Sequence, residues 1–210
     1  MRVQQPFRGG ATQAAVLIVL GSLALTGPTP AKAGPKTYEI DPGHSSVTFS
    51  IRHLFSKVPG RFTDFSGTVV IDPDDPTSGS VTFDVDVASI NTDNEERDRH
   101  LRSDEFFDVA HHPKMTFRST SVREAGENRL TVVGDLGLHG TTRPVTLDVS
   151  ILGFGKLFNV EQAAFEVKTT LNRMDFGISW NGIVEGGGAI LGKDVDVVIN
   201  IEAKLVSGTD

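Results

Sequence analysis

The chain of 210 residues contains no cysteine. Disulfide bonds therefore do not staple the fold, and a lipid anchor carried on an N-terminal cysteine is excluded. A metal site would have no thiolate ligands and would have to use histidine and carboxylate groups. Burial of apolar side chains and backbone hydrogen bonding must hold the protein together.

A long hydrophobic run is also lacking. The apolar segment at residues 14–27 follows Arg2 and Arg8 and carries no charge. It is shorter than the roughly 20 residues that a membrane-spanning helix needs, which argues against the alternative of a transmembrane anchor. Small residues at Ala31 and Ala33 then form an A-x-A cleavage site. We predict a signal peptide at residues 1–33, cleavage after Ala33, and a periplasmic or secreted protein of one domain, residues 34–210.

Positive charge is in deficit, with 20 Lys and Arg residues against 27 Asp and Glu residues. Removal of residues 1–33 would take away three basic residues and no acidic one, which moves the formal net charge from −7 to −10. Such a surface repels phosphate backbones and anionic headgroups. We expect no nucleic-acid partner and at most transient membrane contact.

Aromatic residues with a polar atom are rare: the chain has one Tyr and one Trp against 13 Phe. This bias favours an apolar cavity wall whose aromatic rings carry no hydrogen-bonding group, although a filled core would have the same composition.

The remaining sequence alternates between apolar and polar residues with a period of two. Val81, Phe83, Val85 and Val87, for example, alternate with Thr, Asp, Asp and Ala. Such alternation predicts antiparallel strands with one buried face. We expect about eight strands, at 36–53 with a break at Pro42-Gly43, 61–72, 79–88, 114–122, 129–139, 142–152, 162–172 and 193–206.

Eight antiparallel strands of this kind close into an up-and-down barrel, which removes exposed edges. A barrel of this size is either just filled by side chains or holds one small ligand. A two-sheet sandwich with a filled core is the alternative, and the periodicity does not separate the two folds.

One charged stretch, NEERDRHLRSDEFFD at 94–108, interrupts the strands. Asp93 or Asn94 is suited to cap a helix over 94–103, and Glu96 would complete a capping box with Asp93. Spacing by four predicts ion pairs of Glu95 with Arg99 and of Asp98 with Arg102. Arg97 and Leu101 share another face. We interpret the stretch as a short charged helix across one barrel end, anchored by Leu101, Phe106 and Phe107.

Motifs of catalysis are incomplete. The stretch GGAILGKD at 187–194 resembles a P-loop, but Asp194 replaces the required Ser or Thr and a strand follows. Histidines are scattered, with no H-x-x-x-H pair. An enzyme would have to assemble distant residues such as His44, His53 or His100. We expect no enzymatic activity and no cofactor, and keep a histidine-dependent hydrolase or metal enzyme as an alternative.

Several stretches together resemble the YceI-like family. They are YEIDPGHSSVTFSIRH (38–53), GRFTDFSGTVVID (60–72), the segment from SINTD to STSV (89–122), GDLGLHGTTRPVTLDV (134–149) and NRMDFGISWN (172–181). The resemblance implies an exported binding protein for polyisoprenoids or related lipids. It also implies an all-β, extended, lipocalin-like barrel of eight antiparallel strands with a short helix near one end, whose bore holds a long apolar chain.

The alternating faces place Phe49, Ile51, Phe83, Val85, Met115 and Phe117 inward, and Phe62, Phe165, Phe176 and Trp180 are added as further candidates for ligand binding. Together these ten residues are expected to form the apolar wall of the bore.

Cations near the helix are candidates to hold a polar headgroup at the rim. They are Arg99, His100 and Arg102 on the helix and Arg173 from the late motif. If Arg99 and Arg102 pair with the helix acids, only His100 and Arg173 remain for this role. A partner-binding module with a filled core is a further alternative, and the sequence leaves oligomerisation open.

Overall fold

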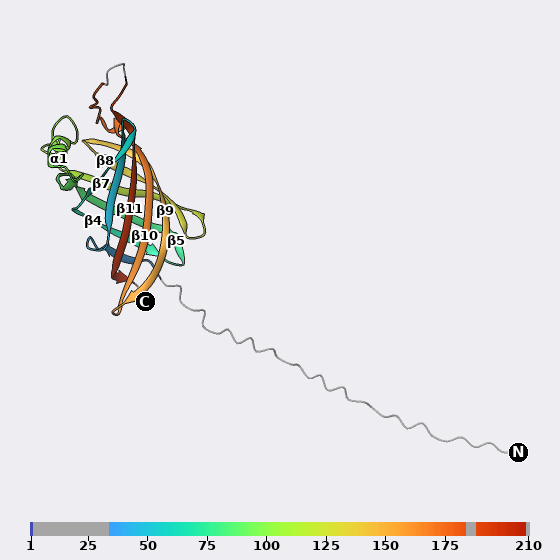
Figure 1. The fold of residues 1–210 in the computed structure, drawn as a ribbon. Coiled ribbons are helices and arrows are strands. Elements are labelled where there is room, and N and C mark those ends of the chain that lie inside the picture. Colours follow the sequence, from blue (N-terminus) through green and yellow to red (C-terminus); the bar gives the residue numbers. More distant parts are fainter. Residues whose placement is uncertain (2–33, 184–187, 209–210) are drawn as a thin grey trace. The chain divides into compact units, whose positions relative to one another are not determined.

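The computed structural model describes Met1, residues 34–183 and residues 188–208. The chain separates into two units, Met1–Ala31 and Lys32–Asp210, and the fold below belongs to the second (Figure 1). The expected signal peptide, residues 1–33, lies outside the described residues. Within the described part, no helix has the length and apolar character needed to cross a membrane.

Strands make up most of the described chain, with one α-helix and two short 3-10 helices. The strands are β1 (Lys36–Ile40), β2 (Ser46–His53), β3 (Ser56–Phe62), β4 (Phe65–Asp72), β5 (Asp75–Asp86), β6 (Ile90–Asn91), β7 (Lys114–Gly126), β8 (Arg129–Leu138), β9 (Thr141–Leu157), β10 (Val160–Asn172) and β11 (Leu191–Gly208). The helices are η1 (Val87–Ser89), α1 (Glu95–Arg102) and η2 (Arg173–Phe176).

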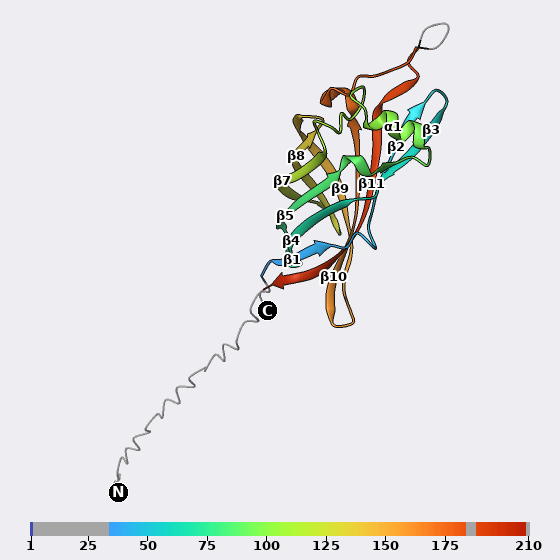
Figure 2. The same ribbon diagram turned by 90° about the vertical axis from the view of Figure 1, so that its left-hand side faces the viewer.

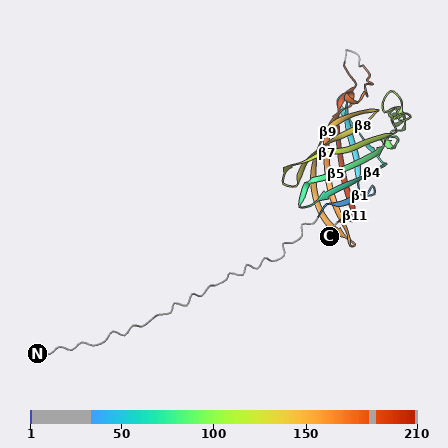
Figure 3. The ribbon, with the colours of Figure 1, turned by 180° about the vertical axis from the view of Figure 1, so that it is seen from behind.

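Eight antiparallel strands close into a barrel, which confirms the predicted fold. The closed order is β1, β4, β5, β7, β8, β9, β10 and β11, with β11 returning to pair with β1. Seen from behind, β1, β4, β5 and β7 run side by side in this order (Figure 3). The closure leaves these strands without a free edge along most of their length, which is the physical reason that alternating strands favour a barrel.

The first two predicted strands are each divided in two. The first divides into β1 and β2 around Pro42-Gly43, as expected, so that β11 pairs with β1 at one end and with β2 at the other. The second extends back to Ser56 and divides into β3 and β4. The β2–β3 hairpin was not predicted, because its two-residue turn, Leu54-Phe55, contains none of the usual turn residues.

These divisions give the barrel an extension at one end. Beyond the closed ring, β2, β3 and β6 continue the sheet from β11. Helix α1 follows β6 and contacts it, and both lie at the end that carries the β2–β3 hairpin (Figure 2). The charged stretch therefore forms a helix at one end of the barrel, as the sequence predicted, where it packs beside the strand extension.

The helix forms where predicted, but its charged residues pair differently. Asn94 is the cap, and its side-chain oxygen accepts a hydrogen bond from the backbone nitrogen of Arg97 at 2.9 Å. Asp93 instead forms a bidentate ion pair with Arg61, at 2.8 and 3.1 Å. The predicted capping box of Asp93 with Glu96 is therefore wrong.

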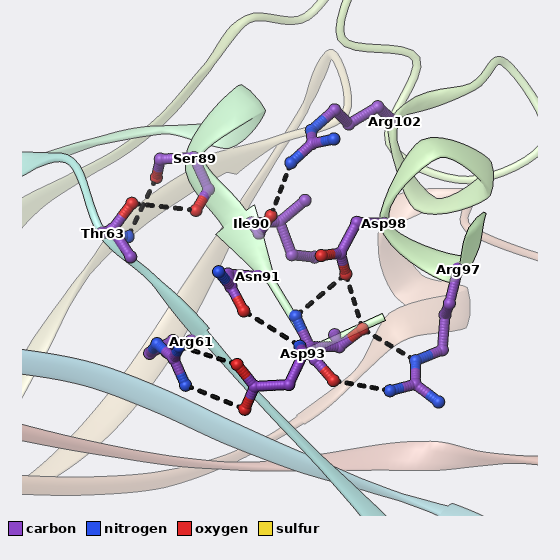
Figure 4. A network of polar contacts seen from close by, with 10 residues as sticks. Arg61, Thr63, Ser89, Ile90, Asn91, Asp93, Arg97, Asp98 and Arg102 are labelled. Carbon is purple, nitrogen blue, oxygen red and sulfur yellow. Dashed lines mark hydrogen bonds and ion pairs between the residues drawn. The ribbon is translucent and has the colours of Figure 1, made fainter. Parts of the chain in front are cut away.

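The predicted ion pair of Asp98 with Arg102 is also wrong. The buried carboxylate of Asp98 accepts hydrogen bonds from the backbone nitrogen and the hydroxyl of Thr92, at 2.9 and 2.5 Å. Arg102 donates to the carbonyl oxygens of Ala88 and Ile90, both at 2.7 Å, and Figure 4 shows the second of these bonds. The helix spacing places the two charged side chains within reach of each other. However, Thr92 in the segment before the helix provides buried donors for Asp98, and the carbonyl oxygens of Ala88 and Ile90 accept hydrogen bonds from Arg102.

The second predicted pair, Glu95 with Arg99, is absent as well. Both side chains are exposed, and no ion pair joins them in the described residues. Exposed pairs of this kind gain little from pairing, because water screens their attraction.

Candidate functional site

The barrel encloses a cavity of about 510 Å³ at the end that carries α1. This volume lies within the range of roughly 300–1,000 Å³ that is typical of ligand pockets. Aliphatic and aromatic side chains from β2, β3, β5, β7, β8, β9, β10 and β11 form most of its wall. The polar residues on the wall are Thr48, His53, Thr92, Arg97, His100, Thr169 and Arg173.

Nine of the ten residues predicted for the apolar wall line this cavity. They are Phe49, Ile51, Phe62, Phe83, Val85, Met115, Phe117, Phe176 and Trp180. The period-two pattern identifies the seven that lie on strands, because every second residue of a barrel strand faces the interior. Phe176 and Trp180 lie in and after η2, where alternation does not apply.

Phe165 is the exception and requires a correction. Its side chain is buried, but it does not line the cavity. It packs edge-on against Phe154 at a ring separation of 6.3 Å, and Phe154 lies 6.3 Å from the ring of Tyr38. Tyr38 and Phe165 are buried toward the opposite end from α1, and the partly exposed ring of Phe154 lies against both. The barrel is therefore filled at one end and hollow at the other, a division along the axis that a period of two does not report.

Aromatic pairs stiffen the wall of the cavity. The Phe49 and Phe62 rings lie 5.6 Å apart, and Phe62 meets Phe107 edge-on at 6.0 Å. On the facing side, the Phe83 ring stacks on Phe65 at 5.7 Å. Ring contacts at these separations are favourable beyond their burial alone, so they hold the side chains in fixed positions.

His100 is the residue of α1 whose ring packs against the aromatic side chains of the cavity wall. Its Nε2 atom lies 2.6 Å from Oε2 of Glu105. Its ring makes edge-on contacts with Phe106 at 4.9 Å and with Trp180 at 5.1 Å. The histidine therefore reaches the cavity as expected, with one ring nitrogen already engaged by a carboxylate.

Arg173 is the most buried cation of the site, with 5% of its surface exposed. Nε donates to the carbonyl oxygen of Gly192 at 2.9 Å, and Nη1 donates to that of Ile178 at 2.7 Å. Burial lowers the pKa of the guanidinium, which nevertheless stays charged in proteins. Among the described residues no carboxylate pairs with it, so a fixed positive charge faces an apolar cavity.

On the helix, Arg97 lines the cavity and Arg99 does not. Arg97 donates from Nε to the hydroxyl and from Nη2 to the carbonyl oxygen of Thr92, at 2.7 and 2.6 Å. Arg99 is exposed and stands on another face. The expected position of Arg99 at the rim is therefore wrong. The usable signal was the spacing of Arg97, His100 and Leu101, which places all three on one helix face.

The histidines of the enzyme alternative occupy different surroundings. Nδ1 of His44 lies 2.8 Å from Asp41 in the exposed break between β1 and β2, whereas His53 and His100 line the cavity. In the described residues, no group of three or more His, Asp or Glu side chains is arranged to hold a metal ion.

The chain is similar to known proteins of one family. The YceI-like domain model matches residues 38–203. Protein YceI of Escherichia coli is 37% identical over 169 residues, which cover 79% of this chain and 85% of that protein.

Among solved structures, the YCEI protein of Campylobacter jejuni has a TM-score of 0.64 and 28% identity, covering 73% of this chain and 89% of its own. A polyisoprenoid binding domain from Saccharophagus degradans has a TM-score of 0.61 and 16% identity, covering 80% and 98%, a likeness of fold alone. On the strength of the domain match and the Escherichia coli relative, this chain belongs to the YceI-like family.

Proposed function

We propose that this protein is an exported carrier that binds a polyisoprenoid or similar long-chain amphipathic lipid, with the apolar tail in the cavity. The observation that carries the proposal is the half-hollow barrel, whose cavity of about 510 Å³ has an almost entirely apolar wall. A wall of this kind accepts a hydrocarbon chain and offers few partners to a polar solute. Membership of the YceI-like family and the fold shared with a polyisoprenoid binding domain support the same ligand class.

Binding of the lipid should be reversible, because the lipid is exchanged with a membrane and not with water. Transfer of a chain from water gains about 0.8 kcal/mol for each methylene, which for a long polyprenyl tail would exceed the ceiling of about 18–21 kcal/mol for noncovalent binding. A membrane is the relevant alternative, because its interior is as apolar as the cavity. Exchange between membrane and barrel is then nearly neutral in free energy, which suits a carrier or a sequestering protein.

The cations at the α1 end define the orientation of the bound lipid in the cavity. Arg97, His100 and Arg173 lie on the cavity wall, while the contacting rings of Tyr38, Phe154 and Phe165 lie toward the opposite end of the barrel. We assign the tail to the wall around Phe83 and an anionic headgroup, such as a phosphate, to the cations. An arginine in a partly dry site forms strong charge-assisted hydrogen bonds with phosphate oxygens.

Extraction tests the ligand class. Protein purified from its native periplasm would be extracted with organic solvent and examined by mass spectrometry, and the intact mass of the protein would locate the cleavage site. We expect one isoprenoid or long-chain amphiphile for each chain and a mature protein that begins at Gly34. An extract without lipid together with stoichiometric transition metal would overturn the carrier in favour of the metal enzyme.

The headgroup is tested with a polyprenyl phosphate and the matching polyprenol. Arg173→Gln should weaken binding of the phosphate about tenfold or more, since a hydrogen bond to a charged group is strong, and leave polyprenol binding little changed. Arg99→Gln, an exposed arginine outside the cavity, is the matched control and should bind both lipids like the wild type. Equal affinity of wild type and Arg173→Gln for the phosphate would leave a protein that recognises the tail alone.

A further inference from the structure

The turn between β2 and β3 breaks two rules of local structure. It consists of Leu54 and Phe55 alone, between the paired residues His53 and Ser56. Leu54 has a φ of 51°, a region that two-residue turns normally fill with Gly, Asn or Asp. Phe55 is fully exposed, at 102% of its reference area. An exposed aromatic tip on a strained turn contributes nothing to the core, and such departures point to function.

This tip stands beside the hollow end of the barrel. His53 and Val58, on the two strands of the hairpin, line the cavity. The backbone nitrogen of Leu54 donates to the carbonyl oxygen of Ile190 at 2.8 Å, and Ile190 also lines the cavity. Figure 2 shows the hairpin at the same end as α1. Phe55 is therefore a projecting apolar group next to the polar end of the site.

Among the described residues near the tip, positive charge prevails, whereas the chain as a whole has a formal net charge of −7. Arg52 and Lys193 are exposed, and neither has a carboxylate partner among the described residues. A Cβ atom on Gly192 would lie 3.2 Å from that of Arg52, which places Arg52 beside the segment that carries Lys193. Of the neighbouring acids, Asp196 is neutralised by Lys57 at 2.5 Å, and Asp194 remains. Among the described residues, this leaves two cations against one acid, a local balance that complements anionic headgroups despite the negative net charge.

We propose that the β2–β3 tip docks on the surface of a bilayer that contains anionic phospholipids. Phe55 enters the boundary of the acyl chains, while Arg52 and Lys193 meet the headgroups. This inference rests on the proposed function, because only a lipid carrier would benefit from docking on a membrane. A tail that crossed water between bilayer and cavity would be disfavoured about fourfold for each exposed methylene. A carrier of such tails gains from bringing its cavity directly against the membrane.

The other end of the barrel provides a matched control. The β9–β10 hairpin also has a two-residue turn, Phe158-Asn159, in which Phe158 has a φ of 48°. Phe158 is 92% exposed, but this hairpin lies beyond the packed rings of Tyr38 and Phe154, away from the cavity (Figure 2). The two phenylalanines thus share exposure at the tip of a two-residue turn, and differ in their place relative to the cavity.

The test is co-flotation of the purified protein with vesicles of phosphatidylglycerol and phosphatidylcholine, and with vesicles of phosphatidylcholine alone. Wild type should bind the anionic vesicles more strongly. Phe55→Asp should lower the partition coefficient about tenfold or more, because a phenylalanine that enters the membrane is replaced by a charge that the membrane repels. Phe158→Asp should stay within about twofold of wild type, since its substitution leaves the cavity end of the barrel unchanged.

Several results would overturn the docking surface. These are wild type that fails to float, equal flotation of wild type and Phe55→Asp, and loss of flotation in Phe158→Asp instead. A wild-type dimer that Phe55→Asp dissociates, without vesicle binding, would assign the tip to a second copy of the chain. Thermal unfolding of each variant must match wild type, as expected for exposed sites.

The lipid content of the same preparations separates this inference from the carrier function. Copurified isoprenoid without vesicle binding overturns the docking tip and leaves the carrier standing. Vesicle binding without any copurified lipid supports the docking tip and overturns the carrier function.

Discussion

The ring of Phe117 on β7 lies against Gly134 on β8, so closely that a Cβ atom at position 134 would collide with the ring and with the carbonyl oxygen of Arg118. The same relation joins the ring of Phe49 on β2 to Gly60 on β3. Both phenylalanines line the cavity. The two glycines therefore let these rings lie flat along the wall, and so help to keep the cavity open.

Replacing Gly134 with alanine should destabilise the barrel and displace Phe117 into the cavity. Overpacking of this kind costs about 1–3 kcal/mol of unfolding free energy. Gly155→Ala on β9 is the control, because no atom would lie within 4 Å of the new Cβ. Urea unfolding and measurement of bound lipid would check both variants. Equal stability of the two would mean that Phe117 moves aside at no cost.

Replacing Phe83 with aspartate should abolish copurification of lipid or prevent folding. Phe83 is buried, lines the cavity and stacks on Phe65. A carboxylate there would have no partner, at a cost of several kcal/mol unless it takes up a proton. Phe83→Leu keeps the site apolar and should retain lipid. Mass spectrometry and circular dichroism report the two quantities, and normal lipid content in a folded Phe83→Asp protein would remove this face from the binding wall.

Asp98 should be the structurally important acid of the charged helix. Asp98→Ala leaves the backbone nitrogen and hydroxyl of the buried Thr92 without their acceptor, which should cost about 1–3 kcal/mol of unfolding free energy. Glu95→Ala, one turn earlier and exposed, should change stability by less than about 0.5 kcal/mol. Chemical denaturation compares the two. Similar losses at both positions would contradict the assignment of Asp98 as the residue that fixes the loop before the helix.

The break between β1 and β2 should make stability depend on pH. Hydrogen bonds from Lys204 first, then from His44, hold the pKa of Asp41 well below its ordinary value. A carboxyl with a lowered pKa in the folded state stabilises the protein above its unfolded pKa of about 3.9, and this contribution is lost as the pH falls below that value. Wild type should therefore exceed Asp41→Asn in unfolding free energy at pH 7. Urea titrations at pH 7 and pH 3 should show this difference narrowing, and a constant difference would contradict the assignment.

Much of the architecture could be predicted from the sequence because it depends on local pattern. Alternation at Val81, Phe83 and Val85 fixes which side chains face inward, and the count of such segments favours a barrel that closes on itself. The charged stretch predicts a helix from its cap and its spacing. These features repeat over two to four residues, so neighbouring positions alone determine them.

The tertiary structure decided which of these residues meet. Phe165 and Phe83 follow the same inward pattern, but only their positions along the barrel axis separate the packed end from the cavity. Asp98 had Arg102 within helical reach and instead binds Thr92, since a buried donor outside the helix competes more effectively than a partly exposed cation. Arg173, far along the chain, reaches the same cavity as Arg97 because the barrel closes and brings η2 to the α1 end. Local spacing sets which faces of the strands are apolar, whereas closure of the sheet assembles the site, because contacts between distant strands depend on register and not on local spacing.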